Sequence, residues 1–183
     1  MPRVQKKRKF YKDVFVNTSK FIKILRETLG EQCSIKEDKD SYGNHSIWMK
    51  LKVKESINVV ANSIKSFKGR CIVATAYKNR DGSHTIIYHF DINGTILNVE
   101  IKTNDNMFFS ITPIIPSANW AEREIREMYG VEPIGHPNTD RLFLDYSIAK
   151  GVLNEFIPLS KLQRGVSKTD IMWKKVEEDI NNG

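Results

Sequence analysis

The densest group of residues that could do chemistry lies between Trp120 and Pro137, where acidic residues, arginines and one histidine alternate. Glu122, Glu124 and His136 are of the types that act as general acids and bases or bind metal ions. A zinc site on a helix needs two histidines one turn apart, and this segment has one histidine. A metal-dependent enzyme using His136 is therefore kept as an alternative, and a histidine with structural hydrogen bonds is favoured.

The rest of the chain offers no second group of reactive residues. Its other histidines, His45, His84 and His89, are isolated, and the sequence has no GxGxxG, P-loop or GxSxG motif. Cys33 and Cys71 lack CxxC spacing and a neighbouring histidine, so we interpret both as buried free thiols. The sequence thus predicts no catalytic residue, no cofactor and no metal site on this chain.

The segment 118–129 is predicted to be a helix. Asn119 and Glu122 have capping-box spacing at its start, and Gly130 supplies its end. One side of this helix is apolar and should face the core; it carries Ala118, Ala121, Ile125, Met128 and Tyr129.

The charges of this helix have the spacing of ion pairs within one helix. Glu122 lies four residues before Arg126, and Arg123 lies four residues before Glu127. The simplest interpretation is a solvated face whose charges pair with each other. Trp120 projects from the charged side, where a tryptophan suits contact with a partner protein. The alternative is that Trp120 folds back against its own strand.

The elements around this helix predict an α+β fold, in which an antiparallel sheet packs with helices. Apolar residues at helical spacing predict helices at 18–29 and 57–67, the second capped by Ser56, with Gly30 and Gly69 at their ends. Two strands should pair as a hairpin, and three should form an antiparallel meander that turns at Asn93-Gly94. The predicted strands are 32–36 and 47–53 for the hairpin, 71–77, 85–92 and 95–103 for the meander, and a short one at 109–112.

The net charge of +7 belongs mostly to one end of the chain, because the first twelve residues hold six basic residues and no acid. The nearly neutral remainder argues against a nucleic-acid groove, although a nucleic-acid-binding protein acting through its tail stays an alternative. We divide the chain into a basic tail (1–16), a single α+β domain (17–161) and a C-terminal extension with an amphipathic helix (162–183). No transmembrane helix and no secretion signal are expected.

The segment that begins at Asn119 resembles the signature of the 30 kDa subunit of respiratory complex I. This protein, also called the C subunit, has counterparts in energy-converting membrane-bound NiFe hydrogenases. The resemblance covers roughly residues 56–161 and extends to a leucine-rich stretch at 142–146. The matching residues are Asn119, Trp120, Glu122, Arg123, Glu124, Glu127, Gly130, Val131, Gly135, His136, Pro137 and Arg141.

This resemblance implies a non-catalytic accessory subunit in the peripheral arm of a complex I-related oxidoreductase, on the cytoplasmic side of the cell membrane. Such a protein holds no cofactor and docks on the large catalytic subunit and the small iron–sulfur subunit. Those partners would hold the iron–sulfur clusters and, in a hydrogenase, the NiFe centre; no nucleic acid is expected. The implied docking residues are Trp120, Glu122, Arg123, Glu124, Glu127, Gly130, Gly135, His136, Pro137 and Arg141.

Specific roles for some docking residues follow from the same resemblance. Arg123 and Arg141 would pair with carboxylates of the partner. Gly135 would permit close approach of the backbone, and Pro137 would fix the turn. Basic residues of the tail would tether the chain to anionic lipid or to an acidic patch on a neighbouring subunit; they are Lys6, Lys7, Arg8 and Lys9.

Departures from the family pattern decide which complex we expect. Pro133, Asn138 and Asp140 replace the usual residues, and the stretch Pro158-Leu159-Ser160-Lys161 lacks an expected arginine. These departures lead us to expect a hydrogenase-type or related ferredoxin-fed complex. The alternative is the 30 kDa subunit of an NADH:quinone oxidoreductase.

Overall fold

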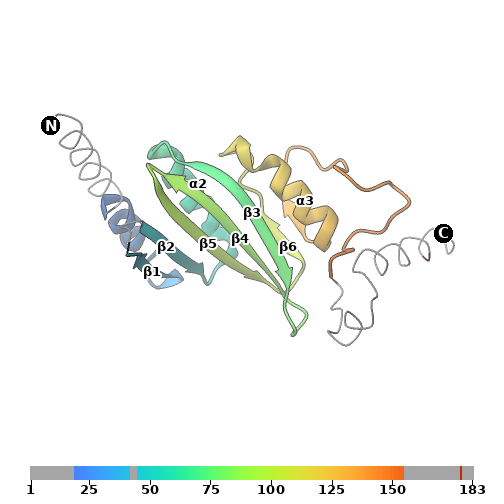
Figure 1. Ribbon diagram of the computed structural model, residues 1–183, viewed down its shortest axis with the longest axis horizontal. Coiled ribbons are helices and arrows are strands. Elements are labelled where there is room, and N and C mark those ends of the chain that lie inside the picture. Colours follow the sequence, from blue (N-terminus) through green and yellow to red (C-terminus); the bar gives the residue numbers. More distant parts are fainter. Residues whose placement is uncertain (1–18, 42–44, 155–177, 179–183) are drawn as a thin grey trace.

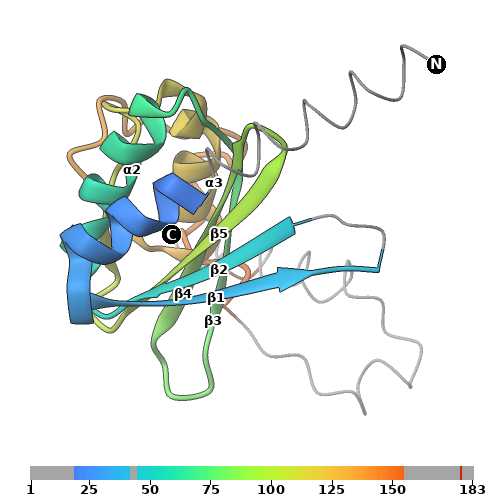
Figure 2. The ribbon, with the colours of Figure 1, turned by 90° about the vertical axis from the view of Figure 1, so that its left-hand side faces the viewer.

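The computed structural model describes residues 19–41, 45–154 and 178, and these form an α+β fold. Five strands make one sheet in the order β1-β2-β5-β4-β3. Figure 2 shows the helices on one face of this sheet. The strands are β1 (Cys33–Lys39), β2 (His45–Leu51), β3 (Arg70–Lys78), β4 (His84–Ile92) and β5 (Thr95–Thr103). The predicted fold class is confirmed.

The remaining elements connect and cover the sheet (Figure 1). A helix over residues 19–29 precedes β1. The strands β6 (Met107–Phe109) and β7 (Glu132–Ile134) pair in parallel as a separate two-stranded sheet. The helices are α2 (Ile57–Ser66) and α3 (Asn119–Tyr129), with single 3-10 turns η1 (Gly30–Gln32), η2 (Lys54–Ser56) and η3 (Pro116–Ala118).

The predicted hairpin and meander are both present. β1 pairs antiparallel with β2, and β3, β4 and β5 pair antiparallel in sequence. Asn93 and Gly94 have φ angles of 52° and 86°, the left-handed geometry that a two-residue turn of this kind requires. A parallel pairing of β2 with β5 joins the hairpin to the meander. The short strand predicted at 109–112 lies earlier in the chain, as β6.

The core lies between the sheet and the helices that cover it. Alternate residues of β4 point into it, with Ile86, Tyr88, Phe90 and Ile92 fully buried. From the helical side, α2 contributes its apolar stripe, which comprises Ile57, Val60, Ala61 and Ile64. Because α3 packs against β3 on this same face, its inward side chains reach the edge of the core.

Two predicted helix signals near α2 are wrong in detail. The Ser56 hydroxyl donates to the Gln32 side chain at 2.9 Å and makes no cap bond to the helix. The left-handed residue after α2 is Lys68, with a φ of 57°. Gly69 is needed for space, because a Cβ there would lie 2.8 Å from a methyl group of Ile64.

Several predicted features fall outside the described residues. These are the basic tail, most of the C-terminal extension and its amphipathic helix. Over the ranges that are described, no helix has the length and apolar character of a membrane span.

Candidate functional site

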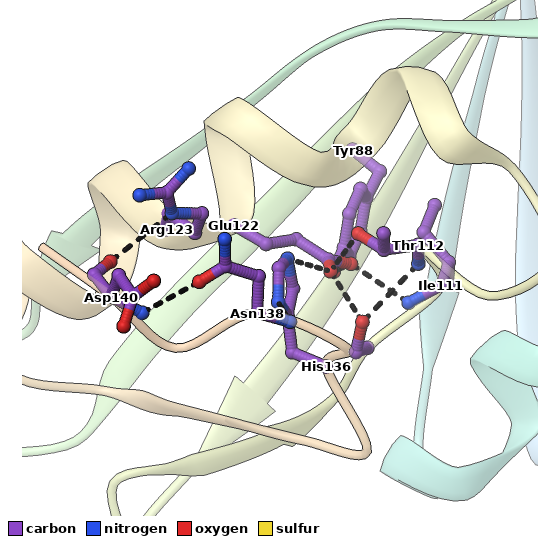
Figure 3. Close-up of polar contacts among 9 residues, drawn as sticks. Tyr88, Ile111, Thr112, Glu122, Arg123, His136, Asn138 and Asp140 are labelled. Carbon is purple, nitrogen blue, oxygen red and sulfur yellow. Dashed lines mark hydrogen bonds and ion pairs between the residues drawn. The ribbon is translucent and has the colours of Figure 1, made fainter. Parts of the chain in front are cut away.

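Glu122 places a fully buried carboxylate on the first turn of α3. Its two oxygens accept hydrogen bonds from the hydroxyls of Tyr88 (2.7 Å), Ser110 (2.5 Å) and Thr112 (2.6 Å). The backbone N–H of Ile111 is the fourth donor, at 2.7 Å. Figure 3 shows Tyr88, Ile111 and Thr112 around the carboxylate. Four donors offset the loss of hydration of a buried charge, so Glu122 fastens α3 to β4 and to residues 110–112.

The predicted role of Glu122 in a capping box is therefore wrong. The side chains at the start of α3 make no cap hydrogen bond, and the Glu122 carboxylate points into the protein. Asn119 opens the helix, and its side-chain oxygen is buried without a hydrogen-bond partner among the described residues. The predicted end of the helix is confirmed, since Gly130 has a φ of 66° in the left-handed region.

His136 lies beside this carboxylate and is also buried (Figure 3). Its Nδ1 accepts a hydrogen bond from the backbone N–H of Asn138 at 3.0 Å, and its Nε2 has no hydrogen-bond partner among the described residues. Nε2 lies 3.7 Å from a Glu122 oxygen, and both side chains have no exposed surface. The imidazole is thus inaccessible to a substrate, which favours the structural interpretation of His136.

The two other titratable groups near Glu122 are held in their neutral forms. Burial, reinforced by the negative charge of Glu122, raises the pKa of Tyr88 well above its ordinary value. Burial likewise raises the pKa of the Cys71 thiol to about 12. Tyr88 therefore remains a hydrogen-bond donor, and Cys71 lacks the thiolate that nucleophilic chemistry needs. Both cysteines are free as predicted, although Cys33 is only partly buried.

Glu127 is a second buried carboxylate of α3, and it binds backbone groups. It accepts hydrogen bonds from the N–H groups of Leu142 (3.3 Å), Phe143 (2.8 Å) and Leu144 (3.0 Å). These residues belong to residues 136–147, which we call the strap; in Figure 1, α3 lies between the sheet and this orange segment. Glu127 thereby satisfies three adjacent donors of a loop that has no regular hydrogen bonding of its own.

The arginines of α3 also hold the strap. The Arg123 guanidinium donates to the backbone carbonyls of Asp140 at 3.1 Å and Arg141 at 2.8 Å. Arg126 donates to the backbone carbonyl of Thr139 and forms an ion pair with Glu132 at 2.6 Å. Every strap-facing charge of α3 therefore has a partner outside the helix.

The predicted ion pairs within α3 are consequently wrong. The spacing of the two pairs, Glu122 with Arg126 and Arg123 with Glu127, is that of ion pairs. Both acids, however, are buried and accept hydrogen bonds from other segments of the chain. Helical spacing identifies only neighbours within the same helix. It cannot indicate the strap, a later segment of the chain that packs over α3. A buried carboxylate gains more from several N–H and O–H donors than from one exposed ion pair.

An exposed aromatic pair lies where α3 and the strap meet, and a third exposed ring follows it along the strap. Trp120 is 64% exposed, as its predicted orientation requires, and contacts Phe143 edge to face with ring centroids 6.3 Å apart. Phe143 is 57% exposed, and Tyr146 is 77% exposed with the Arg141 guanidinium 5.7 Å from its ring centroid. We call Trp120, Phe143 and Tyr146 the aromatic ridge. Sequence reasoning missed the last two as site residues, although an apolar run within an irregular segment was a usable signal.

The other predicted docking residues occupy varied positions. Glu124 and Pro137 are exposed, and Arg141 is partly exposed. Gly135 has a φ of 79°, and a Cβ there would meet nothing within 4 Å. Within this chain the glycine serves the left-handed turn, and its predicted close approach to a partner stays a prediction. Docking itself stays a prediction, as does the tether role of residues 6–9, which lie outside the described part of the chain.

Potential metal ligands do not gather elsewhere in the described ranges, where no three His, Cys, Asp or Glu side chains are placed to share an ion. Of the three groups that the sequence singled out for acid–base chemistry, Glu122 and His136 are built into the packing of α3, and Glu124 is exposed. The accessible part of the site is thus its surface, formed by α3 and the strap.

Comparison with known proteins identifies relatives of this chain. The chain is 36% identical over 113 residues to the C subunit of NADH-quinone oxidoreductase from Ruegeria pomeroyi, which covers 60% of this chain and 53% of the relative. It is 46% identical over 48 residues to formate hydrogenlyase subunit 5 of Escherichia coli, covering 26% of this chain and 8% of that protein. The chain spans about half the length of the NADH-quinone oxidoreductase relatives it matches.

A solved structure is similar in fold. It is described as Nqo5 in a trypsin-resistant fragment (1-134), and it superposes with a TM-score of 0.50 at 16% identity. The match covers 63% of this chain and 96% of the fragment. The profile of the family "Respiratory-chain NADH dehydrogenase, 30 Kd subunit" matches residues 48–166, which include the whole of α3 and the strap. The chain therefore belongs to the family of the 30 kDa subunit of respiratory-chain NADH dehydrogenase.

Proposed function

We propose that this chain is the 30 kDa subunit of a complex I-type NADH–quinone oxidoreductase, where it serves as a non-catalytic docking protein. Support comes from the relatives. Two C subunits of NADH-quinone oxidoreductases match 60% and 48% of the chain, and two hydrogenase-type proteins match 26% and 35%. The comparisons thus favour the NADH:quinone alternative over the hydrogenase-type complex that the sequence departures led us to expect, without deciding between them.

The observation that carries the docking role is the construction of the aromatic ridge. The acid and base of the signature, Glu122 and His136, are closed from solvent, whereas Trp120 on α3 and Phe143 on the strap are exposed, and the strap is fastened to α3. A loop that is already ordered loses little conformational entropy when a partner binds it. Exposed aromatic side chains on such a rigid base are typical of energetic centres in interfaces.

The proposed partners are the large catalytic subunit and the small iron–sulfur subunit of the same complex. In this proposal the iron–sulfur clusters, and any other redox group, belong to the partners, and no cofactor binds this chain. The chain is placed in the peripheral arm, on the cytoplasmic side of the membrane, through its assembly with the other subunits.

Co-purification tests the proposal. The tagged full chain is isolated from membranes of its native host, and its partner subunits are quantified by mass spectrometry. Trp120→Ala and Phe143→Ala should each reduce recovery of the large catalytic partner at least tenfold, since loss of a central interface aromatic costs about 2 kcal/mol or more. Tyr77→Ala is the matched control, because Tyr77 is a comparably exposed aromatic on β3. Full recovery with both ridge variants contradicts the docking role.

The type of complex is decided by its electron donor. The purified assembly should oxidise NADH with a quinone as acceptor. An assembly that oxidises or evolves hydrogen and does not oxidise NADH would establish the hydrogenase-type alternative, while leaving the docking role in place.

A further inference from the structure

The aromatic ridge is bordered by two carboxylates that have no ion-pair partner in the described part of the structure. Glu124 lies one helical turn after Trp120 on the same side of α3, and its side chain is exposed. Asp140 is exposed on the strap, where its own carbonyl is held by Arg123 (Figure 3). Both carboxylates differ in this respect from Glu132, which pairs with Arg126 and Lys150.

The positive charges nearby are turned toward the protein. Arg123 and Arg126 direct their guanidinium groups at carbonyls of the strap and at Glu132. Arg141 donates to the Asp145 carbonyl at 2.9 Å and stacks on Tyr146. Within the described residues, the exposed carboxylates of Glu124 and Asp140 therefore have no ion pair with these arginines.

The acidic character beside the ridge comes from individual exposed carboxylates. Glu122 and Glu127 are buried and add no surface charge, whereas Glu124 and Asp140 are exposed. Because complementary potentials favour one partner over others, an acidic border selects a basic surface. The apolar centre is rigid, since Glu127 and Arg123 fix the backbone that carries Phe143.

We propose that the aromatic ridge binds a partner surface with an apolar pocket for Trp120 and lysine or arginine side chains that pair with Glu124 and Asp140. This inference rests on the proposed function and adds the chemistry of the partner. It assigns the specificity of docking to the two exposed carboxylates, and the affinity to the aromatic side chains.

Charge reversal in the assembled complex tests the acidic border. The full chain with Glu124→Lys and Asp140→Lys should recover at least tenfold less of the partner subunits than the wild type at 150 mM salt, about 1.4 kcal/mol. The neutral pair Glu124→Gln and Asp140→Asn should show a smaller loss and a weaker salt dependence. The control is Glu31→Lys, an exposed acid in η1.

A photo-cross-linking residue tests the partner surface directly. p-Benzoylphenylalanine at Phe143 should form an adduct with another subunit, in a peptide with lysine or arginine near the cross-linked position. An adduct with a peptide that lacks basic residues, or with a second copy of this chain, overturns the inference. So does full recovery of the partners by the charge-reversed chain. If the wild-type chain recovers none of the partner subunits, the proposed function itself fails, so the two failures are distinguishable.

Discussion

Removal of the Glu122 carboxylate is the sharpest test of how α3 is held. In Glu122→Ala, the N–H of Ile111 and the hydroxyl of Tyr88 lose their acceptor in a site without solvent. A buried donor left unsatisfied costs about 1–3 kcal/mol, and the side-chain cavity adds to this. The hydroxyls of Ser110 and Thr112 can rotate toward other acceptors, so we count them less. The expected loss in the free energy of unfolding is about 3–5 kcal/mol.

Glu122→Gln separates the acceptor pattern from the charge. Its side-chain oxygen can keep the Tyr88 and Ile111 bonds, while its amide donates to hydroxyls that turn to accept. The variant replaces charge-assisted hydrogen bonds with neutral ones, but Tyr88 and Ile111 keep their acceptor. We therefore expect the free energy of unfolding to fall by about 1–2 kcal/mol. Glu124→Ala, on the exposed side of the same helix, should change stability by less than about 0.5 kcal/mol.

Urea unfolding of the full chain, followed by circular dichroism, measures these differences. Glu122→Ala should also lower the melting temperature by about 10 °C, from about 2–4 °C per kcal/mol for a chain of this size. The reasoning is refuted if Glu122→Ala is no less stable than Glu124→Ala. It is also refuted if Glu122→Gln is as unstable as Glu122→Ala, since the acceptor pattern would then be irrelevant.

Three further measurements follow from the same geometry. Glu127→Ala should release the strap, seen as faster limited proteolysis within 136–147 while the melting temperature falls only a few degrees; unchanged proteolysis contradicts the anchoring role. Cys33 should react with iodoacetamide at pH 8 before Cys71, whose buried thiol has a pKa of about 12 and should react only after unfolding. The hydrogen bond from Lys54 lowers the pKa of Asp105 to about 2, so the stability it gives is present at neutral pH and lost as the pH falls from about 4 toward 2. In Lys54→Met, NMR titration should find the Asp105 pKa nearer its ordinary value, and an unshifted pKa would disprove the pairing.

Local features of the sequence were enough to predict the elements near the site. Asn93-Gly94 set the hairpin turn of the meander, because both positions tolerate positive φ. Gly130 set the end of α3 for the same reason. The alternation of apolar residues along β4 and β5 placed their inward faces correctly. These predictions depend on interactions between residues a few positions apart, which a single sequence displays directly.

Burial of the charged side chains was decided by the tertiary structure alone. Nothing in the spacing of Glu122 and Glu127 indicates that their partners lie on β4, at 110–112 and on the strap. The parallel pairing of β2 with β5 was equally invisible, since its two strands are separated by a helix and two other strands. From sequence alone, an acid on a helix is predicted to face solvent, because its burial requires hydrogen-bond donors from a second segment. The sequence by itself predicted the helix at the centre of the proposed docking element. Only packing decided that Glu122 and Glu127 point inward, and that the exposed Trp120 lies against Phe143 of the strap.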